Sequence, residues 1–415
     1  MSDSRKKGII PVSPEADTPT SAPVALPAPN FAVLPLSYGG EMMPVSAPGS
    51  FVSRDDTVSR AQDGFALASP FTGSIGDIRS IRHPFLGTVP AAAMLVSKES
   101  AQPVKSLPQI DLPDGIPSDA VISVAKAAGI IDETDGLPLY EKLAKAAREG
   151  KELVMADAAE DQPFSGAALS VLLNRTHEVL TGLRLAACAC DTDRVTVGVF
   201  LKGRRSPVSE AELGVPVTVF GPRYPSVYAK KEFLAKQNGV SFGVQAVAAL
   251  ARAALLKEPQ THVTVSVGGN LPETPRNIYA PLGTPLRELI DLCQVRYPSY
   301  SVVAGGSLTG KLCSPETPLS HCITAILPVE DKPAHKAVAC ISCSACCKVC
   351  PEGLLPIHIM KSARRGHRGL TALLDPERCT GCGCCSWVCP SHIDLTAAVR
   401  HAADAAKGRR KEVSE

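Results

Sequence analysis

The sequence predicts a multidomain protein of the α/β and α+β classes that ends in a small, cysteine-rich helical module. Three observations lead to this prediction. The chain has 415 residues, which is enough for several domains. Its pattern changes from short strand-like pieces to alternating helices and strands, and then to a mixed segment. Ten of its 15 cysteines fall between Cys340 and Cys389.

The N-terminal quarter predicts little helix. Residues 1–30 are rich in Pro, Ala, Ser and Thr without periodicity, which is typical of a disordered tail. Residues 31–100 hold short strand-like pieces such as FAVLPL and VPAAAMLV between Gly, Pro and Asp breaks, so we expect a small all-β domain. Residues 101–117 are proline-rich and predict a linker.

The rest of the chain predicts three further units and a short tail. In residues 118–256, helical stretches such as GVQAVAALARAALL alternate with strand-like ELVMAD and RVTVGVFL, which is typical of an α/β domain with a partly parallel sheet. Residues 258–330 predict a mixed α+β module. Residues 335–403 form the cysteine module, and residues 404–415 a charged tail.

Composition excludes several classes of protein. The net charge is only +2, so we expect no nucleic-acid partner. No apolar run reaches the ~18 residues that span a bilayer, and no apolar stretch resembles a secretory signal. The cysteines are clustered, whereas a disulfide scaffold would scatter them. We therefore expect a cytoplasmic protein without a transmembrane segment.

Two stretches, CISCSACCKVCP and CTGCGCCSWVCP, repeat the pattern C-x2-C-x2-C-x3-C-P. This is the spacing of bacterial ferredoxins with two [4Fe–4S] clusters, in which the fourth cysteine of each motif binds the other cluster. The predicted ligands of cluster 1 are Cys340, Cys343, Cys346 and Cys389. Those of cluster 2 are Cys379, Cys382, Cys385 and Cys350.

Other roles for the cysteines fit the pattern less well. C-x2-C pairs also bind zinc, but a zinc site explains neither the x3-C-P ending nor its second copy. Cys347 and Cys384 lie beside ligands but out of register, so we expect them to pack around the clusters, with ligand exchange as the alternative. We expect the remaining five to be buried free thiols: Cys188, Cys190, Cys293, Cys313 and Cys322.

The C-terminal half, CISCSACCKVCPEGLLPIHIMKSARRG followed by LDPERCTGCGCCSWVCPSHIDLTAAVR, resembles the RnfC subunit of the sodium- or proton-pumping ferredoxin:NAD oxidoreductase. It is equally similar to the cobalamin reductase PduS and the proline-reductase-associated protein PrdC. The resemblance implies the folds of the other units. PLSYGGEMMPV and ASPFTGSIGDI resemble a β barrel-sandwich domain. Gly129 to Leu256 would be a Rossmann-like domain related to the 51-kDa subunit of respiratory complex I, and VTVSVGGNLPETPRNIYAPLGTPLRELI with GGSLTG an SLBB, β-grasp-like domain.

The resemblance also implies a flavin site, but its residues have changed. Family members bind FMN at a loop reading roughly G-x-G-G-A-G-F-P and exchange electrons with NADH. Here residues 131–138 read IDETDGLP, with one glycine, Gly136, and three acids that would repel a phosphate. Three further family stretches are altered in residues 157–163, 224–230 and 243–246. These changes predict a scaffold that binds neither FMN nor NADH.

We therefore expect a relay that passes single electrons through two [4Fe–4S] clusters, and this chemistry requires no catalytic acid or base. The expected partners are redox proteins: ferredoxin, flavodoxin or a flavoprotein on one side, and a terminal reductase or complex on the other. Arg364, Arg365 and Arg368 are interpreted as a solvated helix end, with a docking patch for an acidic carrier as the alternative.

Two other hypotheses differ in class. The first is an enzyme, an FMN-containing NADH-dependent reductase that is cobalamin-reductase-like or part of an Rnf complex. The second is an assembly role, in which the barrel-sandwich and SLBB modules dock onto a membrane complex or a microcompartment. The oxygen lability of such clusters suggests anaerobic metabolism.

Overall fold

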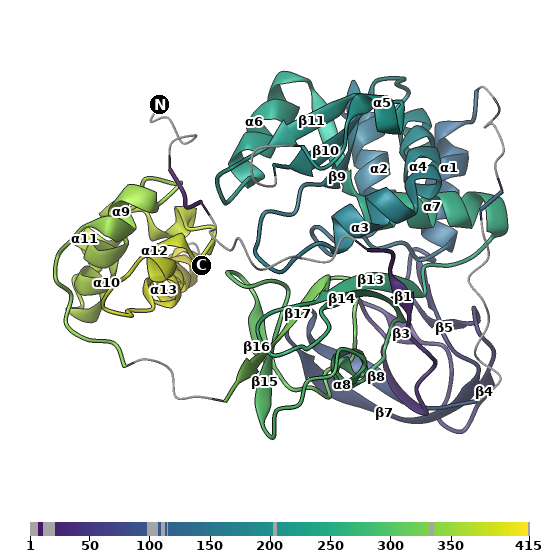
Figure 1. The fold of residues 1–415 in the computed structure, drawn as a ribbon, viewed down its shortest axis with the longest axis horizontal. Helices are drawn as coiled ribbons and strands as arrows, with labels where there is room; N and C mark the ends of the chain where they lie inside the picture. Colours follow the sequence, from purple (N-terminus) through teal and green to yellow (C-terminus); the bar gives the residue numbers. More distant parts are fainter. Residues whose placement is uncertain are drawn as a thin grey trace.

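The computed structural model describes residues 7–10, 21–97, 107–108, 113, 115–201, 206–331 and 336–413, with side chains up to residue 406. Figure 1 shows a larger body, with helices above and strands below, beside a small helical module formed by the C-terminal end of the chain. The predicted class, a mixed α/β multidomain protein with several sheets, is confirmed. The proposed linker, residues 101–117, lies mostly outside the described residues.

The first part of the larger body consists of two antiparallel sheets. One has the strand order β2-β8-β7-β4, and the other the order β3-β5-β6. Their bounds are β2 Phe31–Pro35, β3 Met43–Pro44, β4 Phe51–Val52, β5 Thr57–Arg60, β6 Ala66–Ala68, β7 Gly73–His83 and β8 Gly87–Val96. Side chains alternate between faces along a strand, and Phe65, Phe71, Ile75 and Met94 point into a fully buried core.

The second part is a parallel sheet with the strand order β11-β10-β9-β12. The strands are β9 Leu153–Ala158, β10 Val195–Phe200, β11 Val217–Phe220 and β12 Gly239–Gly243. The helices are α1 Ser118–Ala127, α2 Leu139–Arg148, α3 Ala167–Asn174, α4 Thr176–Ala189, α5 Glu210–Leu213, α6 Val227–Lys236 and α7 Val244–Leu256. Both faces of β9 are covered, since Val154 packs in the main helical core and Met155 packs with residues of α6.

One glycine fixes how closely two of these helices approach. Gly182 of α4 faces α7, and a Cβ at this position would lie 1.7 Å from the main-chain oxygen of Val247. No side chain fits there without moving a helix, so glycine is required by packing.

The third part is a mixed sheet with the order β1-β14-β13-β17-β15-β16. Its strands are β1 Val24–Ala25, β13 His262–Val267, β14 Arg276–Pro281, β15 Tyr300–Ala304, β16 Lys311–Cys313 and β17 Ala325–Glu330, with helix α8 Leu286–Leu292 against it. The expectation of a disordered tail is wrong for β1, which pairs in parallel with β14. Main-chain pairing with a buried strand stabilises this segment, and composition alone does not report such pairing. Residues 1–6 and 11–20 of the tail lie outside the described residues.

The C-terminal module is helical. It contains α9 Ala345–Val349, α10 Pro356–Arg364, α11 Arg368–Leu373, the 3-10 helix η3 Pro376–Arg378, α12 Cys384–Trp387 and α13 Leu395–Val413. Helix α13 continues to Val413 and so includes most of the predicted charged tail, residues 404–415. Among the described residues, no helix combines the length and apolar character that crossing a bilayer requires.

Candidate iron–sulfur centre

Each cysteine motif folds as a tight loop that leads into a short helix. Ser342 and Ser344 in the first loop have φ values of 58° and 60°, and Gly381 and Gly383 in the second have 72° and 81°. The two loops therefore turn in the same left-handed way at matching positions. Gly383 allows nothing larger, since a Cβ there would lie 2.6 Å from the main-chain oxygen of Leu308.

The fold brings the fourth cysteine of the first motif to the second motif. Cys350, at the end of α9, lines a cavity together with Cys379, Cys382 and Cys385. These four form the set predicted for cluster 2, and Cys384, which lies outside the pattern, lines the same cavity. Cys350 and Cys379 also pack together with Leu354, Ile359 and Val399.

The four cysteines predicted for cluster 1 are less enclosed by protein. Cys346 packs with Cys340 and Cys389 around Ile357 and Met360, while Cys343 is exposed. Cys385 contacts this group too, so it lies between the two sets. In the described part of the chain, no three His, Cys, Asp or Glu side chains are arranged to hold one metal ion. In a [4Fe–4S] cubane each thiolate binds a different iron.

The protein surroundings shift the pKa values of these thiols. Burial raises the pKa of Cys350 and of Cys379, and it raises that of Cys385 to about 11. Main-chain N–H groups of Glu352 and Leu354 act in the opposite direction on Cys350. A thiol hydrogen bond from the neighbouring Cys384 lowers the pKa of Cys382 to about 6. N–H groups directed at sulfur are one means by which a protein tunes a cluster's potential.

The cysteines outside the pattern have other surroundings. Cys384 is buried with its sulfur 3.9 Å from the main-chain oxygen of Tyr224, and Cys347 has its sulfur 3.9 Å from that of Cys346. Outside the module, Cys190 and Cys293 are buried, whereas Cys188, Cys313 and Cys322 are only partly buried. All are free thiols.

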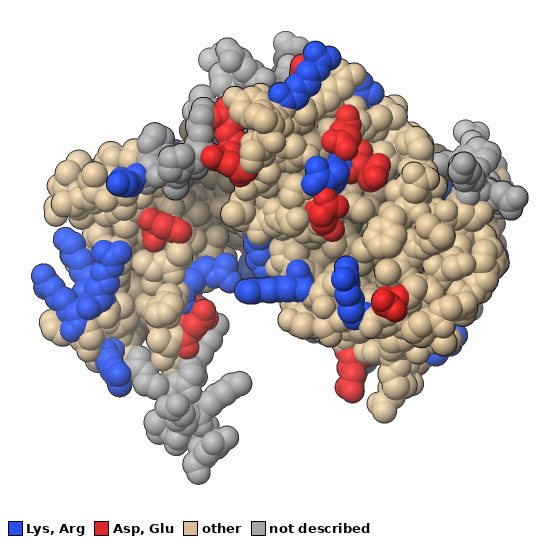
Figure 2. Space-filling view, turned by 90° about the horizontal axis from the view of Figure 1, so that it is seen from below, with Lys and Arg blue, Asp and Glu red and all other residues tan. Residues whose placement is uncertain are grey.

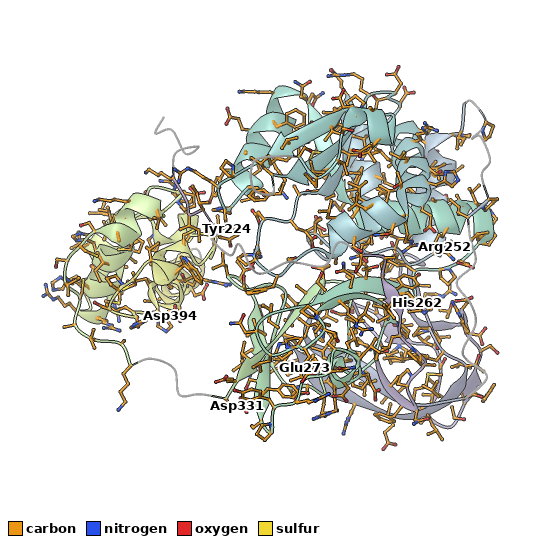
Figure 3. All side chains as sticks on the ribbon, in the orientation of Figure 1. Tyr224, Arg252, His262, Glu273, Asp331 and Asp394 are labelled. Carbon is orange, nitrogen blue, oxygen red and sulfur yellow. The ribbon has the colours of Figure 1, made fainter. Side chains whose placement is uncertain are left out.

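The cluster-2 side of the module rests on the α/β part of the chain. The Tyr224 hydroxyl donates to the main-chain oxygen of Cys382 at 2.7 Å, and that of Tyr228 lies 3.2 Å from Oγ1 of Thr380. Ile9 exchanges two main-chain hydrogen bonds with Tyr224. Figure 3 places Tyr224 where the two bodies meet. The sequence pattern did not predict that Tyr224 and Ile9 join the two bodies, since Tyr224 falls in a flavin-type stretch and Ile9 in the expected tail.

Three of the four altered flavin-type stretches, residues 131–138, 157–163 and 224–230, line one cavity of about 420 Å³ beyond the carboxyl end of β9. The fourth, residues 243–246, is joined to the first by the hydrogen bonds of Glu133. Ligands of parallel α/β sheets bind at such an edge. Five acids and one lysine line it: Glu133, Asp135, Asp157, Glu160, Asp161 and Lys230.

The residues around this cavity do not fit an FMN phosphate. Such a phosphate needs free main-chain N–H groups, and those at the start of α7 are already bonded. The Glu133 carboxyl accepts hydrogen bonds from Gln245 N at 2.7 Å and from Ala246 N at 3.0 Å. A Cβ at Gly243 would lie 2.2 Å from the same carboxyl group, so the space is filled.

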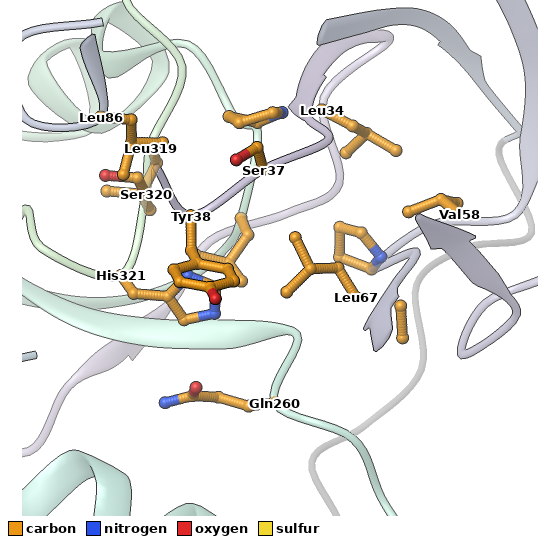
Figure 4. A pocket seen from close by; sticks show the side chains of 14 residues that line it. Leu34, Ser37, Tyr38, Val58, Leu67, Leu86, Gln260, Leu319, Ser320 and His321 are labelled. Carbon is orange, nitrogen blue, oxygen red and sulfur yellow. The ribbon is translucent and has the colours of Figure 1, made fainter. Parts of the chain in front are cut away.

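A second cavity, shown in Figure 4, holds only about 30 Å³ between the N-terminal strands and the mixed sheet. Nε2 of His321 and Oγ of Ser320 line it without a partner among the described residues. Burial lowers the pKa of His321 to about 4, so the ring is neutral. This space suits a water molecule.

Comparison with known proteins agrees with the motif. A family model described as a 4Fe–4S dicluster domain matches residues 339–393. The RnfC subunit of the ion-translocating oxidoreductase complex of Pectobacterium carotovorum is 29% identical over 245 residues, which is 53% of this chain and 32% of that protein. Its Haemophilus influenzae counterpart is 24% identical over 347 residues, 76% of this chain and 52% of that protein. The predicted resemblance to RnfC is confirmed.

This chain is therefore similar to RnfC subunits and contains a match to a 4Fe–4S dicluster domain, and it spans between a third and a half of the length of these curated relatives. The counterpart in Erwinia tasmaniensis is 30% identical over 254 residues, 56% of this chain and 32% of that protein. A solved NAD+-reducing [NiFe]-hydrogenase in the H2-reduced state aligns with a TM-score of 0.48 at 13% identity, covering 69% of this chain and 62% of that one.

Proposed function

We propose that this chain relays single electrons through two [4Fe–4S] clusters between redox partner proteins. Cluster 1 would be held by Cys340, Cys343, Cys346 and Cys389, and cluster 2 by Cys379, Cys382, Cys385 and Cys350. Each cluster, when bound, accepts and releases one electron. The observation that carries the proposal is the cavity lined by Cys350 of the first motif together with Cys379, Cys382 and Cys385 of the second.

The protein residues give the two sites different exposure. Tyr224, Ile9 and Leu308 cover the cluster-2 side, and all three pack in one apolar group with Cys382 and Cys384. By contrast, large exposed side chains flank the cluster-1 cysteines, with Val338 60%, Ile341 67% and Trp387 59% exposed. A protein partner would thus reach cluster 1 more closely than cluster 2.

Charge favours an acidic partner on the module. Residues 336–406 carry eight Lys or Arg and five Asp or Glu. Figure 2 shows Lys and Arg side chains gathered on this smaller body. Arg364, Arg365 and Arg368 are exposed and make no ion pair with another described residue. We propose an acidic carrier of the ferredoxin or flavodoxin type on this face, and a terminal reductase or complex as the second partner.

The remaining units would position the relay. We propose residues 31–100 as a barrel-sandwich domain, 118–256 as a flavin-type scaffold, 258–330 as an SLBB-like domain and 335–403 as the ferredoxin-like domain. Two antiparallel sheets, a four-stranded parallel sheet and a mixed sheet support these assignments. The relatives take their name from an ion-translocating complex, so we propose a cytoplasmic chain bound at the surface of such a complex.

The second candidate is an FMN-containing, NADH-dependent reductase, and the retained 420 Å³ cavity favours it. Anaerobic purification followed by assay of iron, acid-labile sulfide and released flavin separates the two. About eight irons per chain without flavin supports the relay. Near-stoichiometric FMN with the same iron supports the reductase, and iron near zero refutes both.

A further inference from the structure

Helix α7 begins beside the 420 Å³ cavity with an arrangement that suits an anion. It is 13 residues long and follows β12 directly, so its first N–H groups point toward the carboxyl edge of the parallel sheet. N–H groups at such a helix start attract negative charge. Both carboxyl oxygens of Glu133 accept from this turn, one from Gln245 and the other from Ala246.

The loop that carries Glu133 is fixed on both sides. Asp132 is fully buried, accepts from Gly243 N at 3.2 Å and forms an ion pair with Lys142 at 2.5 Å. Lys142 also contacts Asp135 at 2.7 Å. Gly136, with a φ of 75°, closes the loop by donating its N–H to the main-chain oxygen of Asp132. Gly136 supplies the positive φ that the turn requires. Lys142 holds the carboxyl groups of Asp132 and Asp135 in place.

The other acids around the cavity are also engaged within the chain. Asp157 pairs with Lys230 at 2.7 Å. Glu160 accepts from Ala168 N at 2.9 Å at the start of α3, and Asp161 accepts from Ser226 N. Side-chain carboxyls thus occupy both helix starts that face this space.

We infer that Glu133 is an internal substitute for an anionic ligand, and that its carboxyl group closes a phosphate-type site at the start of α7. The α/β domain keeps the cavity but rejects ligands that carry a phosphate there, such as a flavin mononucleotide. The closure is steric, because the carboxyl fills the space in either protonation state. This inference concerns the α/β domain and does not depend on the cluster ligands.

The test uses the full, cluster-loaded chain and inorganic phosphate as the probe. In Glu133→Ala the donors of α7 are free, so we expect phosphate at about ten times its dissociation constant to raise the thermal midpoint by roughly 2–4 °C at constant ionic strength. Wild-type protein should not respond. Glu212→Ala is the matched control, because Glu212 also accepts at a helix start but on the exposed α5, with no cavity beside it.

Two results would overturn the inference: a Glu133→Ala variant that ignores phosphate, or wild-type protein that responds to it equally. Glu133→Ser, a shorter polar variant, is made in parallel. Both are prepared in phosphate, which should replace the lost carboxyl, so failure of both to fold in phosphate also contradicts the inference. Iron content, measured on every sample, reports separately on the relay.

Discussion

The cysteine module and the α/β domain each present a loop that leads into a helix start, and the side chains on these loops differ in kind. In the module, both loops keep four cysteines at ligand spacing and the left-handed turns that aim them. In the α/β domain, the loop at residues 131–138 keeps its turn at Gly136, but carboxyl groups occupy the donors. The fold of the α/β domain does not depend on these carboxyl groups alone, because apolar contacts such as those around Val154 and the close helix approach at Gly182 stabilise it independently.

The largest effect should come from breaking the exchange of cysteines between motifs. Cys350→Ser should remove cluster 2 and leave about four of the eight irons, because cluster 1 keeps its own four thiolates. Iron and sulfide assays with electron paramagnetic resonance measure this. Cys384→Ser, a buried cysteine outside the pattern, is the control and should keep about eight. Full iron in Cys350→Ser, or halved iron in Cys384→Ser, would refute the proposed ligand sets.

A second variant tests the scaffold. Gly182→Ala forces a Cβ against Val247 and should destabilise the α/β domain by about 3 kcal/mol, measured by urea unfolding. Gly369→Ala in α11 is the control, because a Cβ there meets nothing within 4 Å, and its effect should stay within about 1 kcal/mol. Equal effects would show that the helix crossing does not limit stability.

The contact between the two bodies should show a smaller effect. Tyr224→Phe removes the donor to the Cys382 main-chain oxygen and should cost about 1 kcal/mol in a thermal unfolding experiment. Tyr297→Phe is the control. It loses an exposed hydrogen bond from the Tyr297 hydroxyl to the Glu330 carboxyl group, so its loss of stability should be smaller. If Tyr224→Phe matches the control, this hydrogen bond does not hold the module in place.

The last comparison concerns pH. Burial, and secondarily the Asp132 charge, raise the pKa of Glu133 from 4.5 to about 8. A raised pKa means that the stability contribution of Glu133 is complete below pH 4.5 and is lost as pH rises through about 8. Wild-type protein should therefore lose stability relative to Glu133→Gln across this window, in thermal midpoints measured at a series of pH values.

Glu212 gives the opposite sign as a control. Its pKa is lowered by the hydrogen bonds of Ser209, so its contribution is present above pH 4.5 and is lost on acidification. Wild-type protein should lose stability relative to Glu212→Gln only at acid pH. A constant difference between wild type and Glu133→Gln across the series would contradict the assignment of the pKa shift.

The parts of the structure that could be predicted from the sequence are those determined by a short local pattern. The spacing of Cys340 to Cys389 predicted the iron–sulfur domain, because ligand geometry is encoded within a few residues. The alternation of Val195, Val197 and Val199 with smaller residues likewise indicated β10. These features need no information from distant parts of the chain.

Features that depend on distant contacts were not predicted. The pairing of Val24–Ala25 with β14 and of Ile9 with Tyr224 leaves no local periodicity, since each involves only one or two residues. The acids of residues 131–138 were recognised as unsuited to a phosphate, but their partners at Gln245 and Ala246 lie more than a hundred residues away. Only the fold shows that Glu133 accepts hydrogen bonds from the first turn of α7.

A reductive titration of the anaerobic, cluster-loaded chain tests the central claim most directly, with absorbance bleaching as the signal. A relay of two clusters without flavin should take up about two electrons per chain from dithionite and none from NADH. Rapid bleaching by NADH, together with released FMN, would contradict both the relay and the closed site at α7.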